Sequence, residues 1–260
     1  VSVGGQPKYT EGFEPLPQAI DHIRYNDIES ARAAITDDVA AVIVEPIQGE
    51  GGVIPGDTAF LKALRELCDQ TGALLVFDEV QSGVGRTGAL YAYMQHGVTP
   101  DILTSAKALG NGYPIGAMLT TSEIAQHFGV GSHGTTYGGN PLAATVALNV
   151  IDTINQPGFL ARVNEASAKI MGNLDKLAAD YPAVFGKARG AGLLIGLPLA
   201  DAYKGRAKDF TKAAEALGLM LLIAGTDVIR LAPALIVSDE QIAEADRLLR
   251  QAVETIVNAA

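Results

Sequence analysis

A lysine and an acid each follow a short apolar run, and this pair is the first candidate for chemistry in the sequence. Asp78 comes directly after residues 73–77, and Lys107 comes three residues after residues 102–104. Short apolar runs are typical of strands buried on both faces of a parallel sheet, and such strands carry ligand-binding residues at their carboxyl ends. We therefore expect the acid and the amine to lie at the same edge of one sheet.

The amine of Lys107 is a candidate for Schiff-base chemistry, because burial penalises the ammonium form and favours the nucleophilic amine. A nearby carboxylate at Asp78 would suit pyridoxal phosphate, whose electron sink is strengthened when an acid keeps its ring nitrogen protonated. Each residue also has an ordinary interpretation. Lys107 could be a surface lysine, and Asp78 a helix cap or an ion-pair partner.

Residues 83–88 (GVGRTG) match the G-x-G-x-x-G pattern of dinucleotide-binding loops. In such a loop the first glycine lies where a strand ends and a helix opens onto the pyrophosphate. Here the carboxylates of Asp78 and Glu79 stand at the strand end and would repel phosphate. No helix is predicted at Gly88 either, so the sequence disfavours a dinucleotide site.

Further polar residues lie in glycine-rich loops or at strand ends. Thr135 and Thr136 precede the start of a predicted helix, where hydroxyls and free N–H groups could bind phosphate, although a plain turn fits equally well. Arg230 ends a short strand and could bind a substrate carboxylate, and Glu50 is its candidate counter-ion. The histidines lack metal-ligand spacing, so no metal site is expected.

The composition indicates a well-filled globular protein of 260 residues, with 48% hydrophobic residues and a net charge of −10. This charge argues against nucleic-acid and anionic membrane surfaces. One cysteine, Cys68, precludes an internal disulfide and fits a reducing compartment, and helical spacing with Leu64 and Phe60 predicts that it is buried. No apolar run is long enough to span a membrane, so we expect a cytoplasmic protein.

Apolar periodicity predicts alternating strands and helices over the first part of the chain. Strands are expected at residues 40–44, 73–77, 102–104 and 117–119, and helices at residues 28–35, 58–70, 120–128, 140–154 and 160–177. A crossover from the first strand to the second makes these two parallel. After about residue 184, short strands at residues 193–197, 220–224 and 228–231 alternate with a helix at residues 209–216 and a last helix after Ser238.

This pattern predicts an α/β fold with a mostly parallel central sheet flanked by helices, followed by a small α+β unit. We expect a large cofactor-binding domain over residues 1–155, a connecting helix over residues 156–183 and a small C-terminal domain over residues 184–260.

Five blocks of sequence form a specific combination in this order. They are residues 44–52 (VEPIQGEGG), 74–88 (LLVFDEVQSGVGRTG), 100–117 (PDILTSAKALGNGYPIGA), 134–143 (GTTYGGNPLA) and 229–233 (IRLAP). Together they resemble the class III (ornithine-type) pyridoxal-phosphate aminotransferases of fold type I. With residues 2–13 included, the chain looks most similar to the acetylornithine and succinylornithine aminotransferases.

The resemblance implies a role for each matching residue at the cofactor. Lys107 would form the Schiff base and later move the proton. Asp78 would bond the pyridine nitrogen, with Glu79 beside it, Val80 would pack on the ring and Gln81 would reach the phenolic oxygen. In this family the phosphate-binding residue, here Thr136, and the neighbouring Thr135, near the substrate, come from the other subunit of a homodimer.

The resemblance also implies a substrate switch between Glu50 and Arg230. When paired, they would admit the basic amino donor; when they separate, Arg230 would bind the carboxylate of glutamate or 2-oxoglutarate. The implied reaction transfers the ω-amine of N-acetylornithine or N-succinylornithine to 2-oxoglutarate, giving a semialdehyde and glutamate. Another ω-aminotransferase, such as one using 4-aminobutyrate, or an aminomutase remains an alternative.

The chain begins without Met and later than family members do, so we expect it to lack an N-terminal part. The family's Gly/Thr-rich phosphate loop, its ring-stacking aromatic residue and an arginine for the donor's α-carboxylate would lie in that part, with some strands of the central sheet. A catalytically silent fragment is therefore a second hypothesis for these 260 residues.

Overall fold

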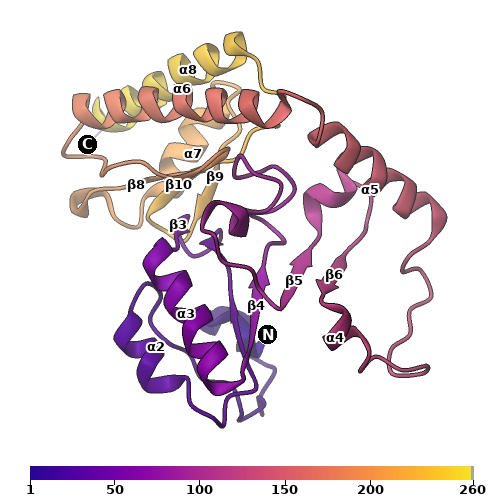
Figure 1. Cartoon of the computed structure of the whole chain (residues 1–260). Coiled ribbons are helices and arrows are strands. Elements are labelled where there is room, and N and C mark those ends of the chain that lie inside the picture. Colours follow the sequence, from indigo (N-terminus) through magenta and orange to yellow (C-terminus); the bar gives the residue numbers. More distant parts are fainter. Residues whose placement is uncertain (259–260) are drawn as a thin grey trace.

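The computed structural model describes residues 1–258, which form two four-stranded sheets and a two-stranded one (Figure 1). The strand orders are β1-β4-β5-β6, β7-β8-β10-β9 and β2-β3. The strands are β1 (Ala41–Val44), β2 (Ile47–Gln48), β3 (Ile54–Pro55), β4 (Leu74–Asp78), β5 (Ile102–Ser105), β6 (Ala117–Thr120), β7 (Arg189–Ala191), β8 (Leu194–Pro198), β9 (Leu222–Ala224) and β10 (Val228–Leu231).

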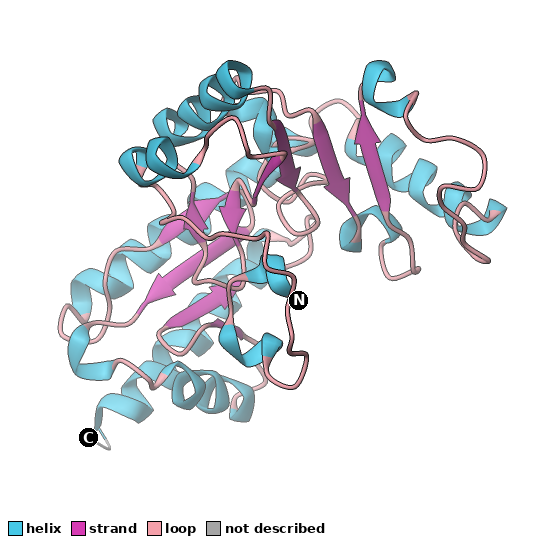
Figure 2. Cartoon of the chain, turned by 90° about the horizontal axis from the view of Figure 1, so that it is seen from below, coloured by secondary structure: helices cyan, strands magenta, loops and turns pink. Residues whose placement is uncertain are grey.

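The α-helices are α1 (Pro7–Thr10), α2 (Ile28–Ala34), α3 (Thr58–Thr71), α4 (Ser122–Ala125), α5 (Pro141–Ile154), α6 (Phe159–Asp180), α7 (Ala207–Ala216) and α8 (Asp239–Asn258). Short 3-10 helices cover Ser2–Gly4, Ala92–Gln95, Lys107–Gly110 and Asp201–Tyr203. Seen from below, the strands form separate groups with helices alongside each (Figure 2). Within the described residues, no helix is both long and apolar enough to cross a membrane.

The crossover predicted around α3 is present: β1 and β4 pair in parallel, with Val44 opposite Phe77. The apolar stripe of α3 packs against β4, and Cys68 in that stripe is 1% exposed. Burial raises the pKa of the Cys68 thiol to about 11, which keeps it protonated and unreactive. The helix ends at Thr71 and is followed by Gly72, whose φ of 77° is a left-handed conformation that favours glycine.

Side chains alternate across each strand, and in the first sheet β4 is buried on one face only. Leu75 and Phe77 are fully buried and pack in the cluster that contains α2 and α3 side chains. On the other face, Ile43 and Met118 are 46% and 48% exposed, and Val76 is half-buried. The expectation of strands buried on both faces is therefore wrong for the described residues.

Polar side chains cap several helices, as their positions in the sequence indicate. The Asn140 side chain accepts a hydrogen bond from the Ala143 N–H, and Pro141 is the first residue of α5. Ser238 and Gln241 form the predicted capping box at the start of α8. The cap predicted at Thr120 is wrong by one residue, because Thr121 accepts from the Ile124 N–H and α4 ends at Ala125.

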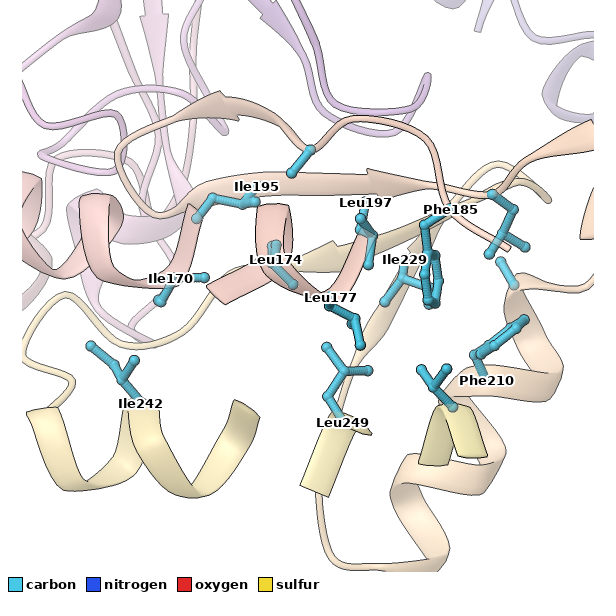
Figure 3. Close-up of a cluster of buried hydrophobic side chains, with 14 of the residues drawn as sticks. Ile170, Leu174, Leu177, Phe185, Ile195, Leu197, Phe210, Ile229, Ile242 and Leu249 are labelled. Atoms are coloured by element: carbon cyan, nitrogen blue, oxygen red, sulfur yellow. The ribbon is translucent and has the colours of Figure 1, made fainter. Parts of the chain in front are cut away.

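The second sheet is antiparallel and supports the largest buried cluster (Figure 3). Leu174 and Leu177 of α6 meet Ile229 of β10, Phe210 of α7 and Leu249 of α8 in this core. Figure 1 shows α6 and α8 running alongside each other over this sheet. Strand β7 was not predicted, because its three residues, RGA, show no apolar alternation.

Candidate active site

The carboxyl ends of β1, β4 and β5 lie at one edge of the first sheet, because these three strands are parallel neighbours. Asp78 is the last residue of β4 and is paired in register with Thr104 of β5. Lys107 follows three residues later, at the start of a 3-10 helix. The topology therefore brings the predicted acid and the predicted amine to the same edge.

Glu45, directly after β1, is a third charged residue at this edge. Burial is the main cause that raises the pKa of its carboxyl group, and Asp78 raises it further, while the Gly49 N–H and the Lys107 amine act in the opposite direction. Its Oε2 accepts the Gly49 N–H at 3.0 Å. Glu45 was not among the predicted site residues, although an acid directly after a predicted strand was also the signal that identified Asp78.

Lys107 has an exposed side chain, so the expectation that burial activates its amine is wrong for the described chain. Its backbone is unusual, however, because φ is 45° in a residue that is not glycine. Non-glycine residues in this left-handed region cost free energy and concentrate at functional sites. Strand β5 ends at Ser105, and this backbone turn directs the chain out of the sheet immediately afterwards.

Glu50, Gln81 and Arg230 form a hydrogen-bonded triad that joins three segments. Arg230 Nη1 lies 2.5 Å from Glu50 Oε1 and 3.3 Å from Gln81 Oε1, and Gln81 Nε2 donates to Glu50 Oε1 at 3.2 Å. Burial, the largest single effect, would raise the pKa of Glu50. The hydrogen bonds from Arg230 and Gln81 and the charges of Arg230 and Lys107 outweigh it and lower that pKa.

Glu79 was predicted to bind cofactor together with Asp78. Its side chain, however, is fully buried. Its carboxylate accepts hydrogen bonds from the backbone N–H groups of Ala92 and Tyr93 and from the Ser82 hydroxyl, at 2.7 to 3.0 Å. Burial raises its pKa, against these three hydrogen bonds. Glu79 therefore fixes the loop that follows β4 and does not point toward Lys107. Val80 donates its backbone N–H to Asp78 Oδ1 at 3.0 Å.

Thr135 and Thr136 lie in the exposed loop between α4 and α5. Figure 1 shows this loop at the edge of the molecule, away from β4. Thr135 Oγ1 accepts the Gly138 N–H at 3.0 Å, and neither threonine hydrogen-bonds to Asp78, Lys107 or Arg230. Within one chain, the two threonines are thus separate from the site residues Asp78, Lys107 and Arg230.

The glycine-rich loop of residues 83–88 does not open into a helix, and its residues are mostly buried. Gly85 lies against Leu235 and Ile154, and Gly88 against Asn164, so little room is left for a pyrophosphate. The dinucleotide alternative is therefore rejected.

A mostly parallel sheet, in which only β6 runs antiparallel, carries an acid and a lysine at one edge and is joined to an antiparallel unit that supplies an arginine. This is the architecture of the fold type I pyridoxal-phosphate-dependent transferases. A family profile described as aminotransferase class-III matches residues 1–253. The chain belongs to the class III aminotransferases.

Curated relatives resemble this chain over nearly its whole length. An acetylornithine aminotransferase of Pseudomonas syringae pv. tomato is 55% identical over 258 residues, which are 99% of this chain and 64% of the relative. A succinylornithine transaminase of Yersinia enterocolitica is 55% identical over 260 residues, all of this chain and 63% of the relative. The chain thus spans less than two thirds of the length of these relatives.

Solved structures of related enzymes have the same fold. The N-acetylornithine aminotransferase of Stenotrophomonas maltophilia is 40% identical, with a TM-score of 0.84 over 94% of this chain and 66% of that one. The ornithine aminotransferase of Toxoplasma gondii is 30% identical, with a TM-score of 0.93 over 100% of this chain and 62% of that one.

The donor set at this edge fits pyridoxal phosphate, the cofactor of class III aminotransferases. A carboxylate suits a protonated pyridine nitrogen, an amine suits the aldehyde, and an amide suits the phenolic oxygen; Asp78, Lys107 and Gln81 supply these groups. The Thr104 hydroxyl beside Asp78 is buried without a hydrogen-bond partner among the described residues. A buried polar atom without a protein partner at this place is expected where a polar ligand binds and supplies the missing hydrogen bond.

Proposed function

We propose that the chain is the catalytic part of an aminotransferase that moves the ω-amine of N-acetylornithine or N-succinylornithine to 2-oxoglutarate. The donor becomes a semialdehyde, and the oxo acid becomes glutamate. The identity of 53–55% to acetylornithine and succinylornithine transaminases over nearly the whole chain is the observation that carries this proposal. The shared edge occupied by Asp78 and Lys107 supports it independently.

Lys107, Asp78, Val80 and Gln81 would hold pyridoxal phosphate, with Thr136 of a second subunit at its phosphate. When bound, the cofactor supplies an electron sink that stabilises negative charge on the substrate carbon. The Lys107 amine then accepts and returns the proton of that carbon. Asp78 holds the ring nitrogen in its protonated form, and Glu79 keeps the following loop in place instead of contacting the cofactor.

Arg230 is the residue for the distal carboxylate of 2-oxoglutarate or glutamate, because a guanidinium binds a carboxylate bidentately. In the absence of that carboxylate, Glu50 pairs with the guanidinium. Thr135 would contact substrate from the second subunit. We further propose a cytoplasmic homodimer, with a cofactor-binding domain over residues 1–155, a connecting helix over residues 156–183 and a small domain over residues 184–260.

The test uses the full-length protein with N-acetylornithine, N-succinylornithine, ornithine and 4-aminobutyrate as donors. Glutamate formed from 2-oxoglutarate gives kcat/KM for each donor, and an acylated ornithine should have the highest value. A higher value for 4-aminobutyrate or ornithine would assign the chain to another ω-aminotransferase. No transamination of any donor would reject the enzyme assignment.

A second measurement tests the lysine directly. Reduction of the cofactor-loaded protein with borohydride, followed by peptide mass mapping, should find the cofactor on the peptide that contains Lys107. The Lys107→Ala variant should lose this label, while Lys62→Ala, at an exposed lysine of α3, should keep it. A label that persists in Lys107→Ala would show that another amine binds the cofactor.

A further inference from the structure

Two arginines outside the Glu50–Arg230 pair connect the segments that carry it. Arg86 lies in the loop of residues 83–88, five residues after Gln81. Its Nη1 donates to the carbonyl oxygens of Leu193 at 3.1 Å and Pro233 at 2.6 Å. The Arg86 carbonyl in turn accepts the Leu193 N–H at 2.8 Å. Arg86 therefore anchors the chain that leaves β10, three residues beyond Arg230.

Arg189, on β7 of the second sheet, makes a similar connection to the loop that carries Glu50. Its Nη2 donates to the Gly52 carbonyl at 2.8 Å, and its Nε donates to the Gly52 and Val53 carbonyls at 3.2 and 3.1 Å. Gly52 and Val53 follow Glu50 by two and three residues. One arginine thus fixes the Arg230 segment and the other fixes the Glu50 segment.

The surrounding packing leaves these segments little freedom to move. Val53 is fully buried, with a φ of 48° that is rare for a β-branched residue. A side chain at Gly196 of β8 would meet Val53 and Val228, and one at Gly192 would overlap the backbone of Arg86 and Gly88. The hydrogen bonds of Arg86 and Arg189 therefore join backbone segments that are already closely packed.

A contribution to folding stability does not by itself explain why arginines occupy positions 86 and 189. Neither has a carboxylate within ion-pair distance among residues 1–258, and burial lowers the pKa of both guanidinium groups. A partly buried charge without a counter-ion is costly, and carbonyl oxygens offset this cost only in part. What the two residues do achieve is geometric, because a guanidinium can hold two carbonyl groups in a fixed relation.

We propose that Arg86 and Arg189 are positioning residues that set the separation of Glu50 and Arg230, and through it the preference of the site for carboxylate-ended substrates. The proposal rests on the proposed function, in which Arg230 binds the distal carboxylate of 2-oxoglutarate. Loosening either contact moves one member of the pair and spoils the bidentate geometry at Arg230, while the amine at Lys107 stays in place.

The test compares Arg86→Lys and Arg189→Lys in the full-length protein. A lysine keeps the charge but is shorter and lacks the rigid planar guanidinium, so it should hold these carbonyl groups less firmly. KM for 2-oxoglutarate should therefore rise roughly tenfold, because small misplacements of a binding group are costly. The Kd of glutarate, measured by calorimetry, should rise in parallel. In contrast, kcat and the KM of N-acetylornithine, which lacks the succinyl carboxylate of the other donor, should change by less than about twofold, since Lys107 and Asp78 are untouched.

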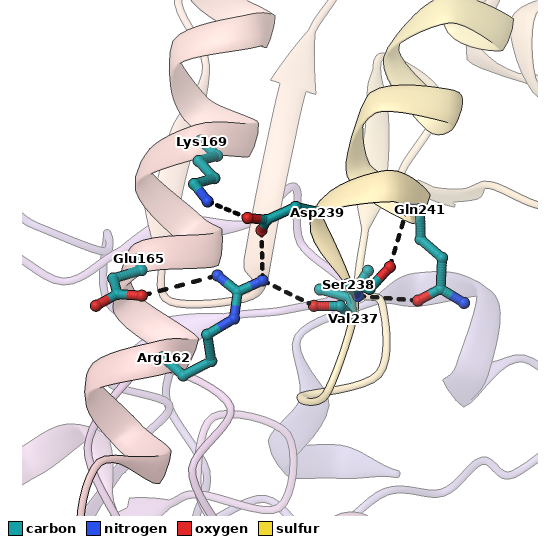
Figure 4. A network of polar contacts seen from close by, with 7 residues as sticks. All are labelled: Arg162, Glu165, Lys169, Val237, Ser238, Asp239 and Gln241. Atoms are coloured by element: carbon teal, nitrogen blue, oxygen red, sulfur yellow. Dashed lines mark hydrogen bonds and ion pairs between the residues drawn. The ribbon is translucent and has the colours of Figure 1, made fainter.

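Arg162→Lys is the matched control, since Arg162 also joins distant segments. Figure 4 shows it between α6 and the start of α8, where it contacts Asp239 at 2.5 Å and the Val237 carbonyl at 3.3 Å. This variant should alter thermal unfolding without changing the glutarate Kd.

Two outcomes overturn the proposal while leaving the proposed function intact: an unchanged glutarate Kd in both variants, or equal losses for donor and acceptor, which would indicate a structural role only. If one variant fails to fold, the other carries the same expectation, and if neither folds the arginines are structural and the proposal is wrong. A wild-type protein that neither transaminates nor binds glutarate would reject the proposed function, and this inference with it.

Discussion

Arg230 Nη1 lies 2.5 Å from Glu50 Oε1, although the two residues are 180 positions apart in the sequence. The guanidinium side chain is 11% exposed and the carboxylate side chain 50% exposed, so one partner is fixed and the other faces solvent. Gln81 bonds to both and links them to the loop after β4. The arrangement suits a pair that opens on the Glu50 side when a second carboxylate competes for Arg230.

Glu50→Gln should therefore strengthen the binding of dicarboxylates. The variant removes the charge that competes for Arg230 and retains the shape of the side chain. Because Glu50 is half-exposed, the pair contributes no more than about 1 kcal/mol, so the Kd of glutarate should fall by up to about fivefold. Calorimetry on the full-length protein measures this, with Glu244→Gln in the exposed Glu244–Arg247 pair as control. Weaker glutarate binding in Glu50→Gln would contradict competition between the two carboxylates.

Glu45→Gln should change how stability depends on pH. The folded-state pKa of Glu45 is raised above its unfolded value of about 4.3, mainly by burial, so the folded protein binds the proton more tightly than the unfolded chain does. Wild-type stability should then fall as pH rises from about 4.3 through the raised pKa. The amide cannot ionise and can still accept the Gly49 N–H, so the variant should lack this decrease.

Urea unfolding at a series of pH values measures the difference between Glu45→Gln and wild type. The variant should gain stability relative to wild type across that pH range and show a constant difference above it. Glu66→Gln, at an exposed position on α3, is the control. Parallel curves for Glu45→Gln and wild type would show that the Glu45 carboxyl titrates alike in the folded and unfolded states.

The sequence allowed most of the first sheet to be predicted, because strand and helix alternate there with clear apolar periods. The run before Asp78 and the stripe containing Cys68 marked β4 and α3 within a residue or two. Residue types made Glu50 a candidate counter-ion for Arg230, and only the resemblance to the family joined the two in a substrate switch. No local pattern encodes a contact between residues so distant in sequence.

The hydrogen-bond partners of Glu79, Arg86 and Arg189 could not be predicted from the sequence, because they depend on which backbone groups lie beside each side chain. Glu79 neighbours Asp78 in sequence but points to the opposite face, where it meets the loop of Ala92 and Tyr93. Alternation along β4 could have given this direction, since residues one apart in a strand face opposite sides. For Arg86 and Arg189, no pattern in the sequence indicates which carbonyl groups they contact in the folded protein.

Glu79→Gln should destabilise the protein, although the change is isosteric. The carboxylate accepts the Ala92 N–H and the Tyr93 N–H on different oxygen atoms. An amide has one acceptor oxygen, so one buried N–H would face an NH2 group and remain unpaired. The expected loss is about 1–3 kcal/mol in the free energy of unfolding. Urea unfolding measures this loss, and a variant as stable as wild type would show that the buried group is already neutral and not needed as a double acceptor.

Variants of Lys107 test whether the backbone at this residue is strained in the conformation that positions the amine. A non-glycine residue with a left-handed backbone costs about 1–2 kcal/mol, while glycine loses about 0.5–1 kcal/mol through its greater freedom in the unfolded chain. Lys107→Gly should therefore be more stable than Lys107→Ala by roughly 0.5–1 kcal/mol, measured by urea unfolding without cofactor. Both variants lack the amine and should fail to transaminate, so the comparison isolates the backbone. If Lys107→Gly were the less stable of the two, the turn after β5 would carry no strain, and its geometry would follow from packing alone.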